Sequence, residues 1–167
     1  MGERITEKDA RRIQEEIDYR RLVVRPKELE AVKEARAQGD LSENFEYKAA
    51  KQDKNRNESR IRYLERMLKN ATIIPEASKE DEIGLNNTVT IYIEEDDEEE
   101  TYRLVTSIRG DSINGKISIE SPMGKALLGH KAGDRVHIQV NAQYGYDAIV
   151  RKIEKTEDDG SDGIRSY

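Results

Sequence analysis

Residues 43–71, ENFEYKAAKQDKNRNESRIRYLERMLKNA, decide the fold of the first half of this 167-residue chain. Eight residues that alternate in spacing by three and four form a heptad seam: Tyr47, Ala50, Lys54, Asn57, Ile61, Leu64, Leu68 and Ala71. The C-terminal part of the seam is apolar, whereas its middle is polar. The pattern predicts one continuous helix, about 43 Å long at a rise of about 1.5 Å per residue.

A second helical pattern lies upstream of this segment. Thr6-Glu7-Lys8-Asp9 is similar to a capping box and predicts a helix from about Glu7 towards Gln38, ended by Gly39. We expect Pro26 to kink that helix, because proline removes a backbone donor and clashes with the preceding turn. The apolar positions change phase there, with one stripe before the proline and a second after it: Ile13 and Ile17, then Leu22, Leu29 and Val32. The connection between the helices is short, which predicts an antiparallel hairpin.

The second half alternates between apolar and polar residues with period two. This pattern predicts strands at residues 88–93, 101–107, 116–120, 135–140 and 146–153. Between the first two strands, residues 94–100 are seven consecutive acids, which we interpret as a solvated hairpin turn; electrostatic steering of a basic partner is the less favoured interpretation. Residues 121–129 begin with a Ser cap followed by Pro and end with Gly, so they predict one short helix packed on the sheet.

Composition supports this division of the chain. Residues 1–75 carry 18 basic and 15 acidic side chains, whereas residues 76–167 carry 11 and 20. We therefore expect a helical domain at 1–75, a linker at 76–87 and a sheet domain at 88–157. Residues 158–167 are acidic and rich in Gly and Ser, which predicts a disordered tail.

The composition also excludes several functional classes. The chain has no Cys, which rules out disulfides, a thiolate nucleophile and Cys-ligated zinc. No phosphate-binding loop, G-x-S-x-G or H-E-x-x-H motif occurs. We expect His130 and His137 to have ordinary surface or packing roles. There is no apolar run of about 18 residues and no signal-type start, so we expect a soluble, cytoplasmic protein without membrane contact.

The connection between the two helices holds the residues that could carry chemistry. Asp40 could cap the second helix and Glu43 could complete a capping box. Alternatively, the two carboxylates form an incomplete site for a hard metal such as Mg²⁺, whose remaining ligands belong to a partner. The nearby cations Arg36, Lys48 and Lys51 could hold a nucleic-acid backbone, or could simply form a solvated surface.

Two segments resemble a known family. Residues 34–51, EARAQGDLSENFEYKAAK, closely resemble the tip signature of the Gre transcript-cleavage factors, GreA type. Residues 117–129, ISIESPMGKALLG, are similar to the C-terminal motif of the same family. The two motifs occur in the family's order, so the resemblance runs from about residue 5 to residue 153.

The resemblance implies an α+β architecture: an N-terminal antiparallel coiled-coil hairpin followed by an FKBP-like antiparallel sheet domain with one short helix. It implies that the sheet domain docks on bacterial RNA polymerase at the mouth of the secondary channel. The coiled coil then enters the channel, and its acidic tip helps to hold the second Mg²⁺ and a water for hydrolysis of backtracked nascent RNA. On this basis we expect a monomeric cofactor of the polymerase. It would not be an enzyme, and would bind no Mg²⁺ in isolation.

The same resemblance implies roles for individual tip residues. Asp40 and Glu43 occupy the acidic positions and are the expected metal ligands and catalytic groups. Arg36 and Lys51 match the family's basic patch and are expected to contact the extruded RNA. We expect the same of Lys48 from its position beside them in the sequence. The residues expected to shape the tip are Ser42, Asn44, Phe45 and Tyr47; at Phe45 the family often has Ala.

Two other functions compete with this expectation. A protein of the same shape could occupy the polymerase channel and inhibit or modulate transcription without promoting cleavage. An FKBP-like fold also suggests a stand-alone prolyl isomerase, but fold does not imply function. A chain with a single Phe and no Trp shows no aromatic pocket of the expected kind. We therefore favour the elongation factor.

Overall fold

The computed structural model describes residues 2–39 and 44–166, and these fall into two compact units. The helical unit contains residues 8–71, and the sheet unit contains residues 3–7 together with residues 72–166. The sequence predicts a first domain that runs from residue 1 to residue 75. The observed boundary is close to the predicted one at the C-terminal end, but a short N-terminal segment belongs to the sheet unit.

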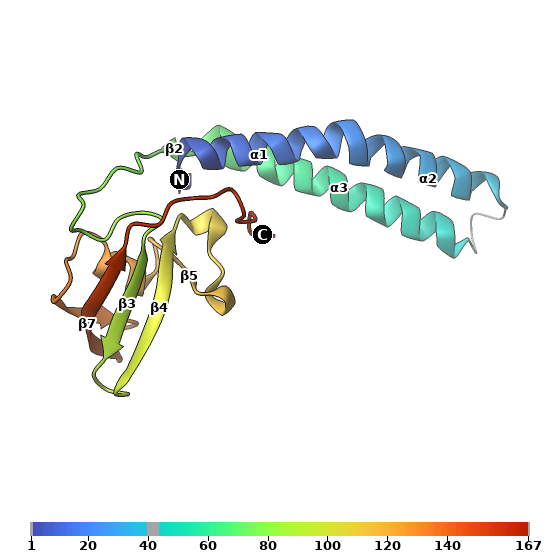
Figure 1. Cartoon of the computed structure of the whole chain (residues 1–167). Coiled ribbons are helices and arrows are strands. Elements are labelled where there is room, and N and C mark those ends of the chain that lie inside the picture. Colours follow the sequence, from blue (N-terminus) through green and yellow to red (C-terminus); the bar gives the residue numbers. More distant parts are fainter. Residues whose placement is uncertain (1, 40–43, 167) are drawn as a thin grey trace. The chain divides into compact units, whose positions relative to one another are not determined.

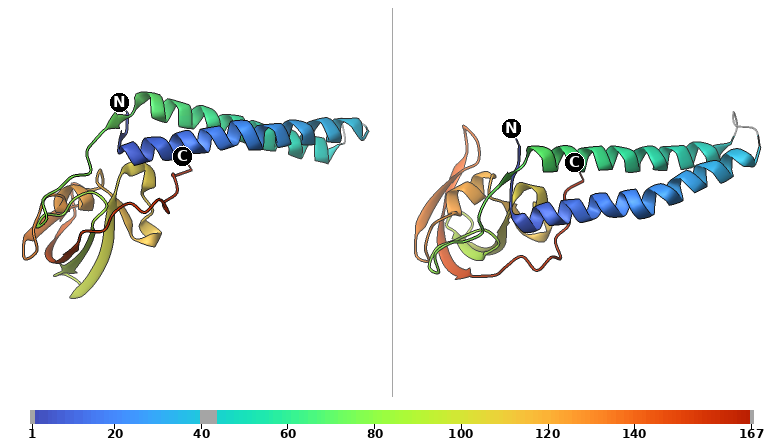
Figure 2. Two further views of the ribbon diagram at one scale, coloured as in Figure 1. Left: turned by 45° about the horizontal axis from the view of Figure 1, so that its top comes forward. Right: turned by 90° about the horizontal axis from the view of Figure 1, so that it is seen from above.

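The helical unit is an antiparallel hairpin (Figures 1 and 2). One arm contains α1 (Glu7–Tyr19), a π-helical segment (Arg20–Val24) and α2 (Arg25–Ala37), and the other is α3 (Phe45–Asn70). The heptad seam is confirmed, because all eight of its residues are buried or half-buried. Ile13, Ile17, Ile61 and Leu64 are each at most 2% exposed. No helix in the described residues is long and apolar enough to cross a membrane.

The expected kink at Pro26 takes a specific form. The irregularity is the π-helical segment directly upstream, and Pro26 itself lies in the first turn of α2, where a missing N–H costs least. A π turn holds one more residue than an α turn and therefore changes which residues face the partner helix. The expected second apolar stripe is therefore wrong for two of its three residues: Leu22 is 76% exposed and Leu29 is 48% exposed, whereas Val32 is half-buried.

The polar middle of the seam is hydrogen-bonded across the hairpin. Asn57 accepts a hydrogen bond from the Arg20 guanidinium at 3.1 Å and donates one to the Arg20 carbonyl at 3.2 Å. Glu16 accepts from both Arg20 (2.7 Å) and Arg60 (2.9 Å). Because buried polar groups are costly unless they are paired, these bonds favour one register of α1 against α3.

The sheet unit is built on a five-stranded sheet of order β5-β4-β3-β7-β6 within the described residues (Figure 1). Its strands are β3 (Thr88–Ile93), β4 (Glu98–Val105), β5 (Lys116–Ser118), β6 (Arg135–Gln139) and β7 (Gly145–Glu154). All neighbours are antiparallel except β4 and β5, which are parallel. The short strands β1 (Arg4–Ile5) and β2 (Thr72–Ile73) form a separate parallel pair.

The core of this unit lies between the sheet and the helix α4 (Pro122–Leu127). Val89, Ile91 and Ile93 of β3 alternate inward, as the period-two pattern predicts. Ser121 caps α4 by accepting a hydrogen bond from the Gly124 amide at 3.1 Å, which confirms the predicted cap. The α+β architecture predicted from the sequence is therefore confirmed.

The acidic run is only partly a turn. The turn occupies residues 94–97, and β4 already begins at Glu98, which pairs with Ile93. Residues 95–99 are exposed, so the expected solvation of the run is confirmed for most of its length. The last three acids join the strand because their backbone groups continue the ladder, while their charged side chains stay accessible to water.

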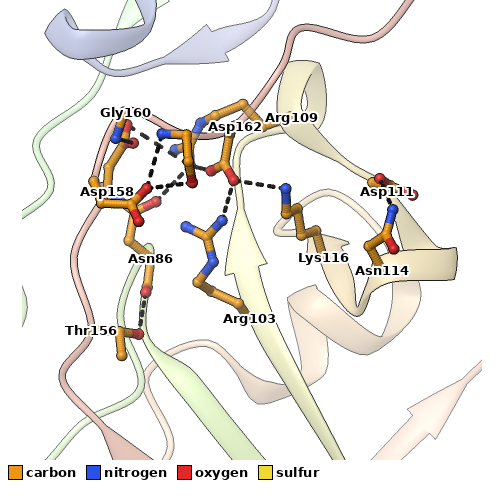
Figure 3. Close-up of polar contacts among 12 residues, drawn as sticks. Asn86, Arg103, Arg109, Asp111, Asn114, Lys116, Thr156, Asp158, Gly160 and Asp162 are labelled. Carbon is orange, nitrogen blue, oxygen red and sulfur yellow. Dashed lines mark hydrogen bonds and ion pairs between the residues drawn. The ribbon is translucent and has the colours of Figure 1, made fainter.

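The C-terminal segment differs from the disordered tail that its composition predicts. Its described part, residues 158–166, folds back on the sheet unit (Figure 3). The Asp162 carboxylate is 5% exposed and accepts hydrogen bonds from three cations, Arg103, Arg109 (2.9 Å) and Lys116 (2.9 Å). Arg165 donates to Glu3 at 2.5 Å. These long-range ion pairs hold the C-terminal segment on the sheet unit. A disorder prediction from the content of Gly, Ser and acidic residues does not take them into account.

Candidate functional site

The hairpin ends where α2 meets the connection to α3. α2 is closed by Gln38, and Gly39 follows with a φ of +142°, a conformation that favours glycine as the sequence suggests. The predicted site residues Asp40, Ser42 and Glu43 lie outside the described residues. The capping role that we considered for Asp40 belongs to Asn44, which precedes the first helical residue of α3.

Asn44 ties the two helices together at this end. Its side-chain oxygen accepts a hydrogen bond from the Tyr47 amide at 2.9 Å, which caps α3. Its side-chain nitrogen donates to the Ala35 carbonyl of α2 at 2.6 Å. One side chain therefore fixes both the start of α3 and its distance from α2, a structural role within the predicted tip-shaping set.

Arg36 and Tyr47 form a pair across the hairpin. The Arg36 guanidinium donates to the Tyr47 hydroxyl at 3.1 Å, and its central carbon lies 5.4 Å from the centre of the ring. The hydrogen bond from Arg36 lowers the pKa of Tyr47, because a cationic donor stabilises the phenolate. The structure thus brings together one residue predicted for RNA contact and one predicted to shape the tip.

The remaining predicted cations, Lys48 and Lys51, lie on α3, and Lys48 is beside an exposed ring. Lys48 places its Nζ 5.7 Å from the centre of the Phe45 ring, and Phe45 is 79% exposed. Lys48 and Lys51 also line a hollow of about 390 Å³ on the surface of α3. The sequence analysis did not identify the other residues of this hollow, which are Gln52, Asn55, Arg56 and Ser59. Gln52 and Asn55 lie four residues after Lys48 and Lys51, and Arg56 and Ser59 follow four residues later again; this helical spacing is the signal that could have found them.

The described residues contain no group of three or more His, Cys, Asp or Glu side chains that could hold a metal ion. Asp40 and Glu43, the carboxylates that we expect to bind Mg²⁺, are not among the described residues. Their donor set of two carboxylates fits a hard cation, but it supplies only part of an octahedral shell. A complete site would therefore need ligands from another molecule.

A second candidate site lies in the sheet unit. A pocket of about 450 Å³ opens beside β5, α4 and the edge strand β6. Its apolar lining comes from Ile117, Pro122, Met123, Ile138, Val140 and Tyr146. The sequence analysis expected no aromatic-lined pocket here, and Tyr146 is the one aromatic residue in this lining. Ile117, Pro122 and Met123 belong to the second signature, whereas Ile138 and Val140 were hard to find because they come from a different part of the chain.

The two histidines make surface hydrogen bonds, as the sequence predicts. His137 lies between Asp147 (2.8 Å) and the Gln139 side-chain oxygen (2.7 Å). These two acceptors raise the pKa of His137, the Gln139 bond contributing most, because both ring N–H groups are needed to satisfy them. His130 forms a similar contact with Asp134 at 2.9 Å.

Comparison with known proteins covers both units. Residues 3–73 match the family model "Transcription elongation factor, N-terminal", and residues 77–155 match "Transcription elongation factor, GreA/GreB, C-term". The chain is 46% identical over 139 residues to transcription elongation factor GreA of Thermoanaerobacter pseudethanolicus, covering 83% of this chain and 88% of that protein. It is 40% identical over 153 residues to GreA of Streptococcus pneumoniae, covering 91% and 95%.

Among solved structures, a crystal structure of GreA factor homolog 1 (Gfh1) of Thermus thermophilus is 29% identical. The alignment covers 92% of this chain and 99% of that one, with a TM-score of 0.44. The matches to the two family models and to the sequence relatives carry the assignment, and they agree with the order of the two signatures.

Proposed function

Because the chain belongs to the GreA/GreB family of transcription elongation factors, we propose that it stimulates bacterial RNA polymerase to cleave backtracked nascent RNA. The hydrolysis is the polymerase's own reaction, and the factor completes the active site from the secondary channel. The observation that carries this proposal is the tip signature at residues 34–51, which spans the end of the hairpin between α2 and α3.

The hairpin supplies the reach that this function needs. α3 has 26 residues, which corresponds to about 39 Å at about 1.5 Å per residue. A pair of packed helices is also narrow enough to enter a channel in a large enzyme. The hydrogen bonds of Asn44 to Tyr47 and Ala35 hold the far end of the two helices in one arrangement. Carboxylate ligands in the connection between α2 and α3 would therefore be attached to two helix ends that are fixed relative to each other.

The sheet unit supplies an attachment point. The pocket beside β5 and α4 is apolar and contains residues of the second signature, including Pro122 and Met123. An exposed apolar surface with polar residues at its rim is typical of a contact with another protein. We assign this pocket to the contact with the polymerase at the mouth of the channel.

At the tip, Asp40 and Glu43 act as two carboxylate ligands, and the polymerase provides the others. When held there together with the polymerase ligands, Mg²⁺ would supply stabilisation of the negative charge on the reacting phosphodiester oxygens. Lys48 and Lys51, with Arg36 positioned by Tyr47, contact the phosphates of the extruded RNA. The chain therefore contributes ligands and positioning, which is the role of a cofactor protein.

The test is a cleavage assay on backtracked polymerase complexes with the double variant Asp40→Asn, Glu43→Gln. We expect cleavage to fall to the level of polymerase alone, while competition with wild type for polymerase changes by less than about twofold. Each single variant should recover partly at higher Mg²⁺, because a weaker ligand set needs more metal for occupancy. Glu46→Gln is the matched control, since Glu46 is an exposed acid in the first turn of α3.

Wild-type cleavage by the double variant would refute the proposed role of the acids. If the wild-type protein slows transcription without any cleavage, the alternative of a channel-occupying regulator holds instead.

A further inference from the structure

Phe45 is an aromatic side chain that the fold does not use. It is the only Phe in the chain and the first residue of α3. At 79% exposure it is the most exposed aromatic side chain among the residues that the structure describes. Its first-turn neighbour Tyr47 is half-buried and paired with Arg36. Packing among the described residues therefore does not account for Phe45.

One cation lies against the Phe45 ring, and further cations follow it along α3. Lys48 lies one turn further along α3, with its Nζ 5.7 Å from the ring centre. The hollow that begins at Lys48 continues through Lys51 to Arg56, and all three charged residues in its lining are basic. Arg56 lies 3.7 Å from the carboxylate of Asp53. Among the described residues, no acid forms an ion pair with Lys48 or Lys51.

An exposed ring followed by cations along one helix face matches the chemistry of single-stranded nucleic acid. Every base offers a π face to an aromatic side chain, and every nucleotide carries a phosphate for a lysine. An apolar protein surface would also accept Phe45, but it gains nothing from Lys48 and Lys51 and would have to desolvate them. The combination therefore favours RNA over protein as the partner.

We propose that Phe45 stacks on a base of the extruded RNA while Lys48 and Lys51 contact the adjacent phosphates. This inference rests on the proposed function and adds a specific contact to it. Phe45 is a positioning residue in this scheme: it orients the RNA and leaves metal binding to the acids. Stacking tolerates any base but requires one, so the contact depends on the presence of a base and on an aromatic ring at position 45.

The first experiment compares Phe45→Trp, Phe45→Tyr, Phe45→Leu and Phe45→Ala in cleavage of backtracked complexes. The RNA carries either a normal extruded 3′ segment or one with abasic nucleotides. On normal RNA we expect the Trp and Tyr variants to match wild type and the Leu and Ala variants to be about 10-fold slower. On abasic RNA all five proteins should cleave at similar rates. Tyr19→Ala is the control, because Tyr19 is an exposed aromatic residue of α1.

The second experiment needs no polymerase. The chain contains no Trp, so Phe45→Trp introduces a single fluorophore at the site. We expect single-stranded oligoadenylate to quench its fluorescence, an abasic strand of equal charge to leave it unchanged, and Lys48→Ala to weaken the quenching. If wild type fails to stimulate cleavage but this quenching occurs, the proposed function fails and the stacking stands.

Two results would overturn the inference. If Phe45→Leu cleaves like wild type while Phe45→Ala does not, Phe45 packs against the polymerase. If the defect is equally large on abasic RNA, the ring does not act on a base. Circular dichroism of each variant checks that α3 is intact.

Discussion

In the helical hairpin burial is confined to one seam between two arms, whereas the sheet unit encloses a contiguous apolar core between its strands and α4. Both units bury polar groups: Asp9 and Asn57 of the hairpin, like Asp162 and Arg109 of the sheet unit, are at most 5% exposed. Because the apolar contacts of the hairpin lie along a single seam, we expect it to relax around a lost side chain more easily than the sheet unit does.

The largest expected effect comes from truncating a buried leucine in each unit. Leu64 of α3 and Leu104 of β4 are both 0% exposed. Leu→Ala costs about 2–5 kcal/mol, depending on how far the surroundings collapse. We expect Leu104→Ala to cost about 4 kcal/mol and Leu64→Ala about 2 kcal/mol. Hydrogen exchange read separately on β3 and on α3 measures the two losses.

Leu22→Ala and Ile113→Ala are the matched controls, because these side chains are 76% and 95% exposed. Each should change stability by less than about 0.5 kcal/mol. Equal costs at Leu64 and Leu104 would show that the hairpin is packed as rigidly as the sheet unit.

A somewhat smaller effect is expected from Asp162→Asn. Removing one partner of a buried ion pair typically costs about 3–5 kcal/mol. We expect about 3 kcal/mol here, because Arg103 and Lys116 can turn towards water while Arg109 stays buried. Chemical denaturation measures the loss, and Asp159→Asn is the control on an exposed acid of the same segment. An unchanged stability would mean that residues 158–166 contribute nothing to the fold of the sheet unit.

The Asp162 carboxylate should also make the stability of the fold depend on pH. Burial opposes ionisation of Asp162, but hydrogen bonds from Lys116, Arg103 and Arg109 outweigh it and hold the pKa of Asp162 below its ordinary value. A depressed folded-state pKa gives stability that is fully present above about pH 5 and is lost as the pH falls below about 4 towards the folded-state value. Asp162→Asn should therefore reduce the slope of stability against pH in this acid range, as measured by denaturation at a series of pH values.

The smallest effect is expected at the end of the hairpin. Asn44→Ala removes the cap of α3 and should cost about 1 kcal/mol. Asn44→Asp keeps the acceptor for the Tyr47 amide but loses the donor to the Ala35 carbonyl. If capping dominates, amide protection in the first turn of α3 survives in the Asp variant and falls in the Ala variant. Equal loss in both variants would assign the role of Asn44 to the contact between the helices.

Local patterns predicted most of the secondary structure. The spacing of Ile61 and Leu64 identified the buried seam because a helix repeats its faces regularly. The same rule failed for Leu22, because the π turn at Arg20–Val24 changes that repeat. Pro26 alone does not predict a π turn. The start of β4 was missed by three residues, because strand pairing with β3 prevailed over the low strand preference of three acids.

Features that depend on distant residues were not predictable in this way. The order of Gly, Ser and Asp in residues 158–166 gives no sign that Arg109 and Arg103 lie within reach of Asp162. The pocket of the sheet unit needs residues from both β6 and the second signature. At the tip, the structure adds the pairing of Arg36 with Tyr47 and the contact of Lys48 with Phe45, which the sequence did not predict. The roles of Asp40 and Glu43 stay predictions from the sequence.

The pairing of β1 with β2 also has a consequence for the order of folding. Arg4 lies opposite Thr72 and Ile5 opposite Ile73, so the whole hairpin is an insertion between two strands of the sheet unit. In an unstructured chain, joining these strands would require closing a long loop, with an entropic cost that grows with its length. If the helical hairpin forms first, it brings residues 7 and 71 close together and removes most of that entropic cost. Helix formation should therefore precede completion of the sheet unit, even though β1 is the first of these segments to be synthesised.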